Sequence, residues 1–191
     1  MATKSSFSNM LITLLVITLA ASLLLGFVYN STQEPIAQAK VQKVNDAIKS
    51  VLPEFDNQPS EQAQTLSLDG GELTLYRATL GGEPVGTAIK TFSKNGFGGT
   101  IELMVGFRPD SSIHRIAVVG HNETPGLGDK IDPTKSNFCV QFEGKHPEQF
   151  KLIVKKDGGD VDAITASTIS SRAYCDAVQR AYTALQKGGA Q

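Results

Sequence analysis

The sequence predicts an α+β fold, in which an N-terminal transmembrane helix is followed by one domain with a mainly antiparallel sheet flanked by helices. A long apolar segment near the start predicts the membrane helix. Consecutive segments with two-residue alternation predict the sheet. Apolar residues at steps of three and four, before and after these segments, predict the flanking helices. The 191 residues have room for one ordinary domain plus an appendage.

The predicted membrane helix is the apolar run from Met10 to Val28, and no charged residue occurs between Lys4 and Glu34. A helix of this length measures roughly 28 Å, close to the hydrocarbon thickness of about 30 Å. A signal peptide is the alternative, but its apolar region is usually about 7–15 residues long and ends at a small-residue cleavage site. The run here is longer and is followed by "YNSTQEP", without an A-x-A. We therefore expect an uncleaved anchor.

The charges that flank the span are nearly balanced. Lys4 precedes the span, and Lys40 and Lys43 follow it within about 15 residues, so the positive-inside rule favours neither orientation strongly. A short tail before a large domain points to an anchor whose domain lies outside the cytoplasm.

A second helix is expected after the membrane. Pro35 can open a helix at its first turn, and Leu52-Pro53 would end it. The following residues, 54–66, are polar and contain a proline, so we expect a loop or linker. The apolar stripe of the helix consists of Val41, Val44, Ile48 and Val51.

The clearest strand pattern lies in residues 100–107, "TIELMVGF", which predict a half-buried strand. "RPDSS" supplies turn residues for a hairpin after it. The inward positions of this strand would be Ile101, Leu103, Val105 and Phe107, alternating with Glu102, Met104 and Gly106. Weaker patterns predict strands at 72–78, 84–92, 113–120, 137–142 and 150–156.

The last predicted element is a helix that Gly188-Gly189 would close. Just before it, "DAITASTISSRAY" places six hydroxyls between Thr165 and Tyr174. N–H groups at a helix start are unpaired and favour anions, so this place suits a phosphate. The simpler interpretation is an N-cap with additional polar neighbours. The apolar stripe consists of Tyr174, Val178, Ala181 and Leu185.

A glycine-containing loop, "GHNETPGLGDKI", follows the strand segment "IAVV". Gly126 and Gly128 would let the backbone approach a flat ligand, Pro125 would hold the turn, and Leu127 could offer an apolar face. A tight surface turn is the alternative. A second glycine cluster, "NGFGG", precedes the strand that begins at Thr100. Neither cluster contains a dinucleotide-binding or Walker pattern.

Other classes of function find little support. The 18 basic and 19 acidic residues form no basic stripe, so no nucleic-acid partner is expected. No histidine pair has zinc spacing; His121-x-Glu123 could bind a metal with distant help, but a solvated loop histidine is preferred. No nucleophile elbow or acid–base pair is evident. Cys139 and Cys175 fit no metal spacing; they could form a disulfide or be two buried thiols.

Taken in order, four motifs follow the anchor: "GFGGTIELMVGF", "HNETPGLGDKI", "QFEGK" and "DAITASTISSRAYCDAV". This order resembles the flavin-binding domain of the G subunit of the Rnf electron-transport complex, which is related to the C subunit of the sodium-pumping NADH:quinone reductase. The resemblance extends from the anchor to Lys187. "ETPGLGDKI" and the hydroxyl-rich motif are its specific parts.

The resemblance implies FMN attached through its phosphate to a threonine hydroxyl. The family motif runs Asp, two residues, Ser or Thr, Gly or Ala, Ala, Thr, one residue, and Ser or Thr. In this register Thr168 is the acceptor. Ser167 stands where alanine is usual and places a second hydroxyl beside the acceptor. The motif falls on Asp162, Thr165, Ala166, Ser167, Thr168 and Ser170.

A phosphodiester keeps about one negative charge, so helix N–H groups and neighbouring hydroxyls could suffice to hold it. Candidate phosphate ligands are Thr165, Ser167 and Ser170. The resemblance also implies that the isoalloxazine would lie against Glu123, Thr124, Gly126, Leu127 and Gly128. It implies no catalytic site of the chain's own, because the redox chemistry belongs to the flavin.

By resemblance, the chain is a single-pass flavoprotein of the bacterial inner membrane that relays electrons in an Rnf-type complex, which couples ferredoxin/NAD electron transfer to ion transport. The other membrane subunits and a flavin transferase, which uses FAD and acts outside the cytoplasm, would be its partners. A quinone-reductase C-type subunit and a cofactor-free tethered assembly module are the alternatives. The predicted organisation is a cytoplasmic tail (1–9), an anchor (10–29), an amphipathic helix and linker (30–68) and a covalent FMN-binding domain (69–191).

Overall fold

A computed structural model describes residues 7–68 and 70–188. The chain divides into two compact units, with the boundary between Gln42 and Lys43. Two details of the sequence predictions lie outside the described residues: the charge of Lys4 in the N-terminal tail and the place of Gly189 at the end of the last helix.

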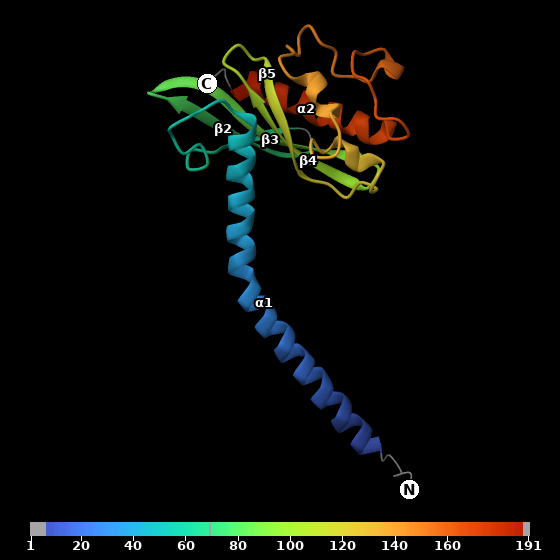
Figure 1. The fold of residues 1–191 in the computed structure, drawn as a ribbon. Coiled ribbons are helices and arrows are strands. Elements are labelled where there is room, and N and C mark those ends of the chain that lie inside the picture. The colour runs from blue at the N-terminus through green and yellow to red at the C-terminus, as the bar shows by residue number, and fades with distance from the viewer. Residues whose placement is uncertain (1–6, 69, 189–191) are drawn as a thin grey trace. The chain divides into compact units, whose positions relative to one another are not determined.

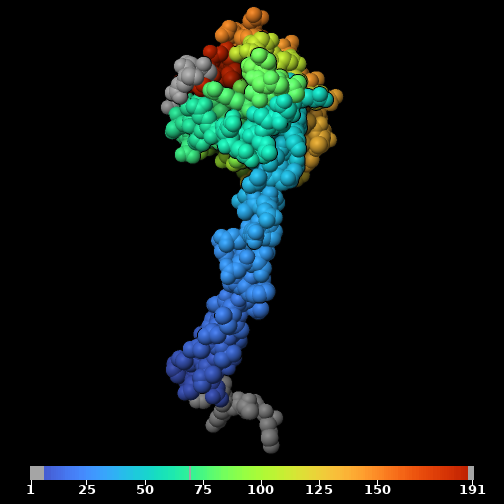
Figure 2. All heavy atoms as spheres, turned by 90° about the vertical axis from the view of Figure 1, so that its left-hand side faces the viewer, coloured from blue at the N-terminus to red at the C-terminus, as the bar shows by residue number. Residues whose placement is uncertain are grey.

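The first unit is built from helix α1 (Phe7–Val51), most of which it contains. Among the described residues, α1 alone is long and apolar enough to cross a membrane, with a mean hydropathy of 2.7 in its most apolar window. Its large apolar side chains between Phe7 and Val28 are exposed, which fits contact with lipid. Figure 2 shows the atoms of this helix in blue. The predicted membrane helix is therefore confirmed as an N-terminal apolar helix.

The start that we predicted for a second helix is wrong. Pro35 lies inside α1, which continues without interruption to Val51. A proline removes only one N–H donor, and helix-compatible residues on both sides let the helix continue. Of the predicted apolar stripe, Val41 is exposed, whereas Ile48 and Val51 are fully buried in the second unit.

The second unit contains one antiparallel sheet of five strands in the order β1-β2-β3-β4-β5. The described architecture confirms the α+β class. Four of these five strands, β2 to β5, were predicted. Strand β1 was missed, because its first residues fall in the segment that we expected to be a loop. The strands are β1 (Gln64–Leu68), β2 (Gly71–Leu80), β3 (Glu83–Gly96), β4 (Gly99–Phe107) and β5 (Ile113–Gly120).

Both faces of the sheet are covered within this unit. Helix α2 (Thr168–Gly188) packs along one face (Figure 1), where Leu103 and Phe107 of β4 meet its apolar side. The last turns of α1 cover the other face, where Met104 is fully buried beside Val51. The prediction of a half-buried β4 holds at its start, where Thr100 is exposed and Glu102 is partly exposed, whereas further along the strand Met104 and Gly106 are buried on the second face as well.

Two predicted strands are replaced by other structure. Residues 137–142 contain the 3-10 helix η2 (Phe138–Phe142), and Phe138 and Phe142 both pack against Tyr174 of α2. Residues 150–156 form no ladder; they contribute one isolated bridge, Val154–Val161, and run into η3 (Lys155–Asp157). These apolar segments cover the end of the core without joining the sheet.

The two cysteines, Cys139 and Cys175, are free and buried in the structure. Burial raises the pKa of the Cys175 thiol to about 12, so it stays protonated at neutral pH. Of the two possibilities that the sequence allowed, the structure therefore has the buried thiols.

Candidate functional site

The hydroxyl-rich segment folds into a tight turn that leads directly into α2. The Ser167 N–H donates to the Ile164 carbonyl across 3.0 Å, and Ala166 in between has φ +61°. A side chain is disfavoured at this backbone angle, which glycine adopts freely. Glycine, which the motif of the resembling family also has at this position, would adopt this backbone angle without strain, and alanine carries the smallest side chain that must tolerate it.

Only some of the six hydroxyls serve to start the helix. The Ser171 hydroxyl accepts the Ile164 N–H and donates to the Ser167 carbonyl, both at 3.0 Å. It therefore holds the turn against the first helical residues. Thr165 is exposed, and Tyr174 is fully buried with its hydroxyl unpaired. The simpler interpretation of the motif, an N-cap with polar neighbours, accounts for Ser171 but leaves Thr168 and Ser170 to be explained.

Ser170 points away from the capping interactions. Its hydroxyl donates to Oε2 of Glu123 at 2.5 Å, and both residues are buried, with 2% and 5% exposure. The other carboxylate oxygen, Oε1, accepts the Gly98 N–H at 3.0 Å. One carboxylate thus joins three separate segments: the β3–β4 turn, the loop after β5 and the first turn of α2.

The glycines of the two loops make room for this carboxylate. A Cβ on Gly128 would meet Oε2 of Glu123 and would lie 2.7 Å from the Ser170 hydroxyl. A Cβ on Gly96 would lie 2.6 Å from Oε1 of Glu123. Gly126 has another reason to be glycine, since its φ is +78°. The glycines therefore serve first to pack Glu123 and to form the turn.

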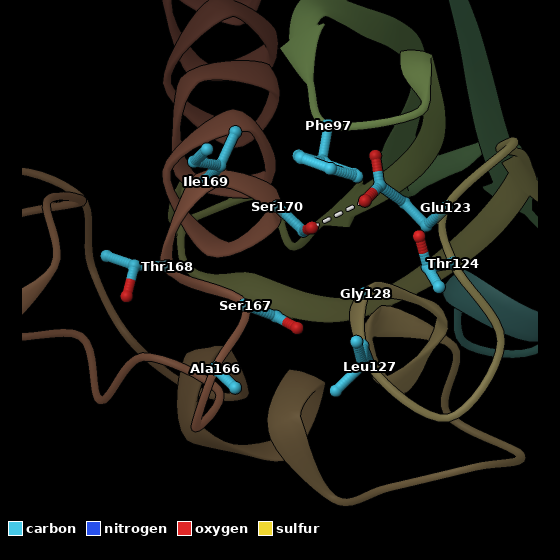
Figure 3. A pocket seen from close by; sticks show the side chains of 10 residues that line it. All are labelled: Phe97, Glu123, Thr124, Leu127, Gly128, Ala166, Ser167, Thr168, Ile169 and Ser170. Carbon is cyan, nitrogen blue, oxygen red and sulfur yellow. Dashed lines mark hydrogen bonds between the residues drawn. The ribbon is translucent and has the colours of Figure 1, made fainter.

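The three joined segments surround a cavity of about 330 Å³. This volume lies at the lower end of the range for small-molecule sites, roughly 300–1,000 Å³. Figure 3 shows Phe97 and Leu127 on opposite sides of the Ser170–Glu123 hydrogen bond, with the Ser167 hydroxyl turned toward the loop that carries Leu127. The lining residues are Phe97, Glu123, Thr124, Leu127, Gly128, Ala166, Ser167, Thr168, Ile169 and Ser170.

Most of the predicted site residues meet at this cavity. Gly126 and Thr165 do not line it. Glu123, which the resemblance places against the isoalloxazine, lines the cavity, and its two carboxylate oxygens accept hydrogen bonds from Gly98 and Ser170. The predicted residues that the structure brings together are Glu123, Thr124, Leu127, Gly128, Ser167, Thr168 and Ser170.

Phe97 and Ile169 were missed. Both are large apolar side chains with substantial exposure, 69% and 47%. Their signal in the sequence is weak: Phe97 is the bulky residue within "NGFGG", and Ile169 follows the acceptor position. With Leu127, which is 44% exposed, they give the cavity an apolar rim.

The polar part of the cavity is the start of α2. The first N–H to bond within the helix is that of Ser171, so the N–H groups of Thr168, Ile169 and Ser170 are left for other acceptors. The first turn has no acidic residue, and the helix dipole favours an anion here. Among the ten lining residues Glu123 alone carries an ionisable group. A helix start with hydroxyls beside an apolar rim fits a flat ligand with an anionic group.

A metal is not supported in the described part of the chain, where no group of three or more metal-ligating side chains occurs. His121 accepts the Glu123 N–H through Nδ1 at 3.1 Å. The sequence left open a metal site formed by His121 and Glu123. In the structure, the ring of His121 instead accepts a hydrogen bond from the backbone of Glu123 within the same loop.

Comparison with known proteins agrees with this geometry. Residues 96–183 match the family of the FMN-binding domain. The G subunit of the ion-translocating oxidoreductase complex of Shewanella baltica (strain OS223) is 37% identical over 179 residues, covering 88% of this chain and 84% of that protein. The corresponding G subunit of Vibrio cholerae serotype O1 (strain M66-2) is 36% identical over 167 residues, covering 83% and 80%.

The chain belongs to the family of G subunits of ion-translocating oxidoreductase complexes. The whole cavity, from Phe97 to Ser170, falls within the region that matches the FMN-binding domain. The apolar helix α1 lies outside that region.

Proposed function

We propose that this chain is a membrane-anchored flavoprotein subunit of an Rnf-type ion-translocating complex, and that it relays electrons through FMN bound covalently at Thr168. The single observation that carries the proposal is the cavity at the start of α2, which Thr168 lines and which lies inside the FMN-binding region. Bound there, FMN would accept and pass on electrons. The other subunits of the complex would be its donor and acceptor.

The residues present fit such a group. A phosphodiester at the Thr168 hydroxyl would place one negative charge at the free N–H groups of the helix start. Ser167 and Ser170 stand beside it as candidate neighbours. Phe97 and Leu127 provide apolar surface for the planar ring. The absence of a lysine or arginine from the lining is compatible with a diester, which carries less charge than a free phosphate.

The proposal includes a location and a maturation step. The exposed apolar length of α1 supports a single-pass anchor in the bacterial inner membrane. We place the flavin domain on the non-cytoplasmic side, where a flavin transferase would install FMN from FAD. Protease added to intact spheroplasts tests the orientation, because a domain on the outer side would be digested and a cytoplasmic one would be protected.

The attachment can be tested by co-expressing the protein with a flavin transferase, denaturing it and illuminating the gel with ultraviolet light. We expect a fluorescent band in wild type that is absent from Thr168→Val. Thr183→Val is a matched control, since Thr183 lies on the same helix away from the cavity. An unlabelled wild-type band would contradict the proposal and favour a cofactor-free assembly module.

A further inference from the structure

Glu123 is a buried carboxylate that forms none of the salt bridges between described residues. Its two oxygens accept hydrogen bonds from the Gly98 N–H and the Ser170 hydroxyl, both of which are neutral donors.

A second buried carboxylate in the same loop shows the contrast. Asp129 is 4% exposed, but Oδ2 pairs with Nζ of Lys135 at 2.7 Å, and Asp129 does not line the cavity. The charge of Asp129 is thus compensated locally. Glu123 lines the cavity instead, and the two hydrogen bonds that its carboxylate accepts in the described structure come from neutral donors.

We propose that the Glu123 carboxylate lowers the reduction potential of the flavin in this cavity. This inference rests on the proposed function. Reduction adds an electron, and thus negative charge, to the flavin. The flavin would lie in the cavity that Glu123 lines. Charges interact more strongly in a buried site than in water, so a fixed carboxylate there disfavours that gain. The carboxylate itself is neither oxidised nor reduced.

Ser170 moderates this effect. Its hydroxyl donates a hydrogen bond of 2.5 Å to Glu123, which draws part of the negative charge toward the proton. Loss of the hydroxyl would leave the carboxylate less compensated. Removal of the charge and removal of the donor should therefore shift the flavin potential in opposite directions, a result that structural damage alone would not give.

The test is a spectroelectrochemical titration of the full-length protein with attached flavin, with attachment checked by fluorescence of the denatured band. Glu123→Gln keeps the size of the side chain, and the Ser170 hydroxyl can rotate to accept from the amide. We expect its midpoint potential to lie above that of wild type. Ser170→Ala should lie below wild type.

Asp176→Asn is the matched control. Asp176 also lies on α2 and accepts a hydrogen bond from a serine, Ser93, at 2.6 Å, but it does not line the cavity. It is six residues from Ser170, about 9 Å along the helix. Its substitution should shift the potential less than Glu123→Gln does.

An unchanged or lowered potential in Glu123→Gln would overturn the inference, as would an equal rise in Asp176→Asn. If Glu123→Gln carries no flavin, the midpoint potential of Ser170→Ala decides. A potential below that of wild type supports the inference, and an unchanged or raised potential overturns it. An unlabelled wild type contradicts the proposed function instead, so the two failures are distinguishable.

Discussion

The Ser170 hydroxyl donates to the Glu123 carboxylate at 2.5 Å and so fixes the start of α2 to the loop after β5. The same carboxylate accepts the Gly98 N–H, which adds the β3–β4 turn. These contacts involve protein groups alone. The cavity walls are therefore held together by the chain itself, and Thr168, the proposed acceptor, lies on a segment that these contacts already hold in place.

Ser170→Ala should destabilise the second unit. The substitution removes a hydrogen bond to a buried charged group, and such a bond contributes about 1.5–3 kcal/mol. Urea unfolding followed by circular dichroism would measure the loss. Ser67→Ala, at an exposed position of β1, is the control and should change the free energy of unfolding by less than about 0.5 kcal/mol. Equal stability of the two variants would show that the contact contributes nothing.

Gly128→Ala should disrupt the same contact from the other side. Its Cβ would collide with the Glu123 carboxylate and the Ser170 hydroxyl, so we expect a loss of about 1–3 kcal/mol in unfolding free energy and reduced flavin loading. Gly120→Ala is the matched control, because a Cβ there would meet no atom within 4 Å. Thermal unfolding and in-gel fluorescence measure the two effects. Normal loading of Gly128→Ala would argue against a preformed cavity.

Substitutions of Ala166 test the turn that precedes Thr168. A β-branched residue is strongly disfavoured at φ +61°, so Ala166→Val should cost about 1–3 kcal/mol and hinder attachment at Thr168. Ala166→Gly relieves the strain but makes the unfolded chain more flexible, and should leave stability nearly unchanged. Denaturant titration of both variants checks this. The prediction fails if valine is tolerated as well as glycine.

The Lys135–Asp129 pair predicts a dependence of stability on pH. Hydrogen bonding and charge from Lys135 lower the pKa of Asp129 below its usual 3.8. Stability from a depressed carboxyl pKa is present at neutral pH and is lost as the pH falls through that pKa. Lys135→Gln should therefore be less stable than wild type near pH 7, and the gap should close in acid. Denaturant titrations across this range test it, with Lys130→Gln, at an exposed neighbour, as control.

The sequence was sufficient to predict the helices and strands in which apolar residues recur at a regular spacing. The alternation in β4 and the stripe of α2 predicted both, because each side chain there has a fixed direction relative to the core. Residues 137–142 were misread because an apolar segment this short suits a strand or a helix, and only packing on Tyr174 decides. The strand β1 was missed because it is a short edge strand with polar residues.

Residues that belong to a recognisable motif could be predicted from the sequence to lie near one another. The hydroxyl at Thr168 and the loop around Leu127 were found in this way, and both line the cavity. The pairing of Glu123 with Ser170 could not be predicted, since 47 residues separate them and neither spacing nor composition reports such a contact. Phe97 was likewise visible only once the β3–β4 turn was placed beside α2.

Mass spectrometry of peptides from the protein co-expressed with a flavin transferase is the decisive test of FMN attachment at Thr168. We expect one flavin per chain, with an added mass equal to FMN minus one water because the threonine oxygen displaces AMP from FAD, and fragment ions that place it on Thr168. The neighbouring Ser167 hydroxyl, which is 7% exposed and turned toward the loop of Leu127 (Figure 3), should be unmodified. Flavin found on Ser167, or no flavin on the peptide that contains both residues, would contradict attachment at Thr168.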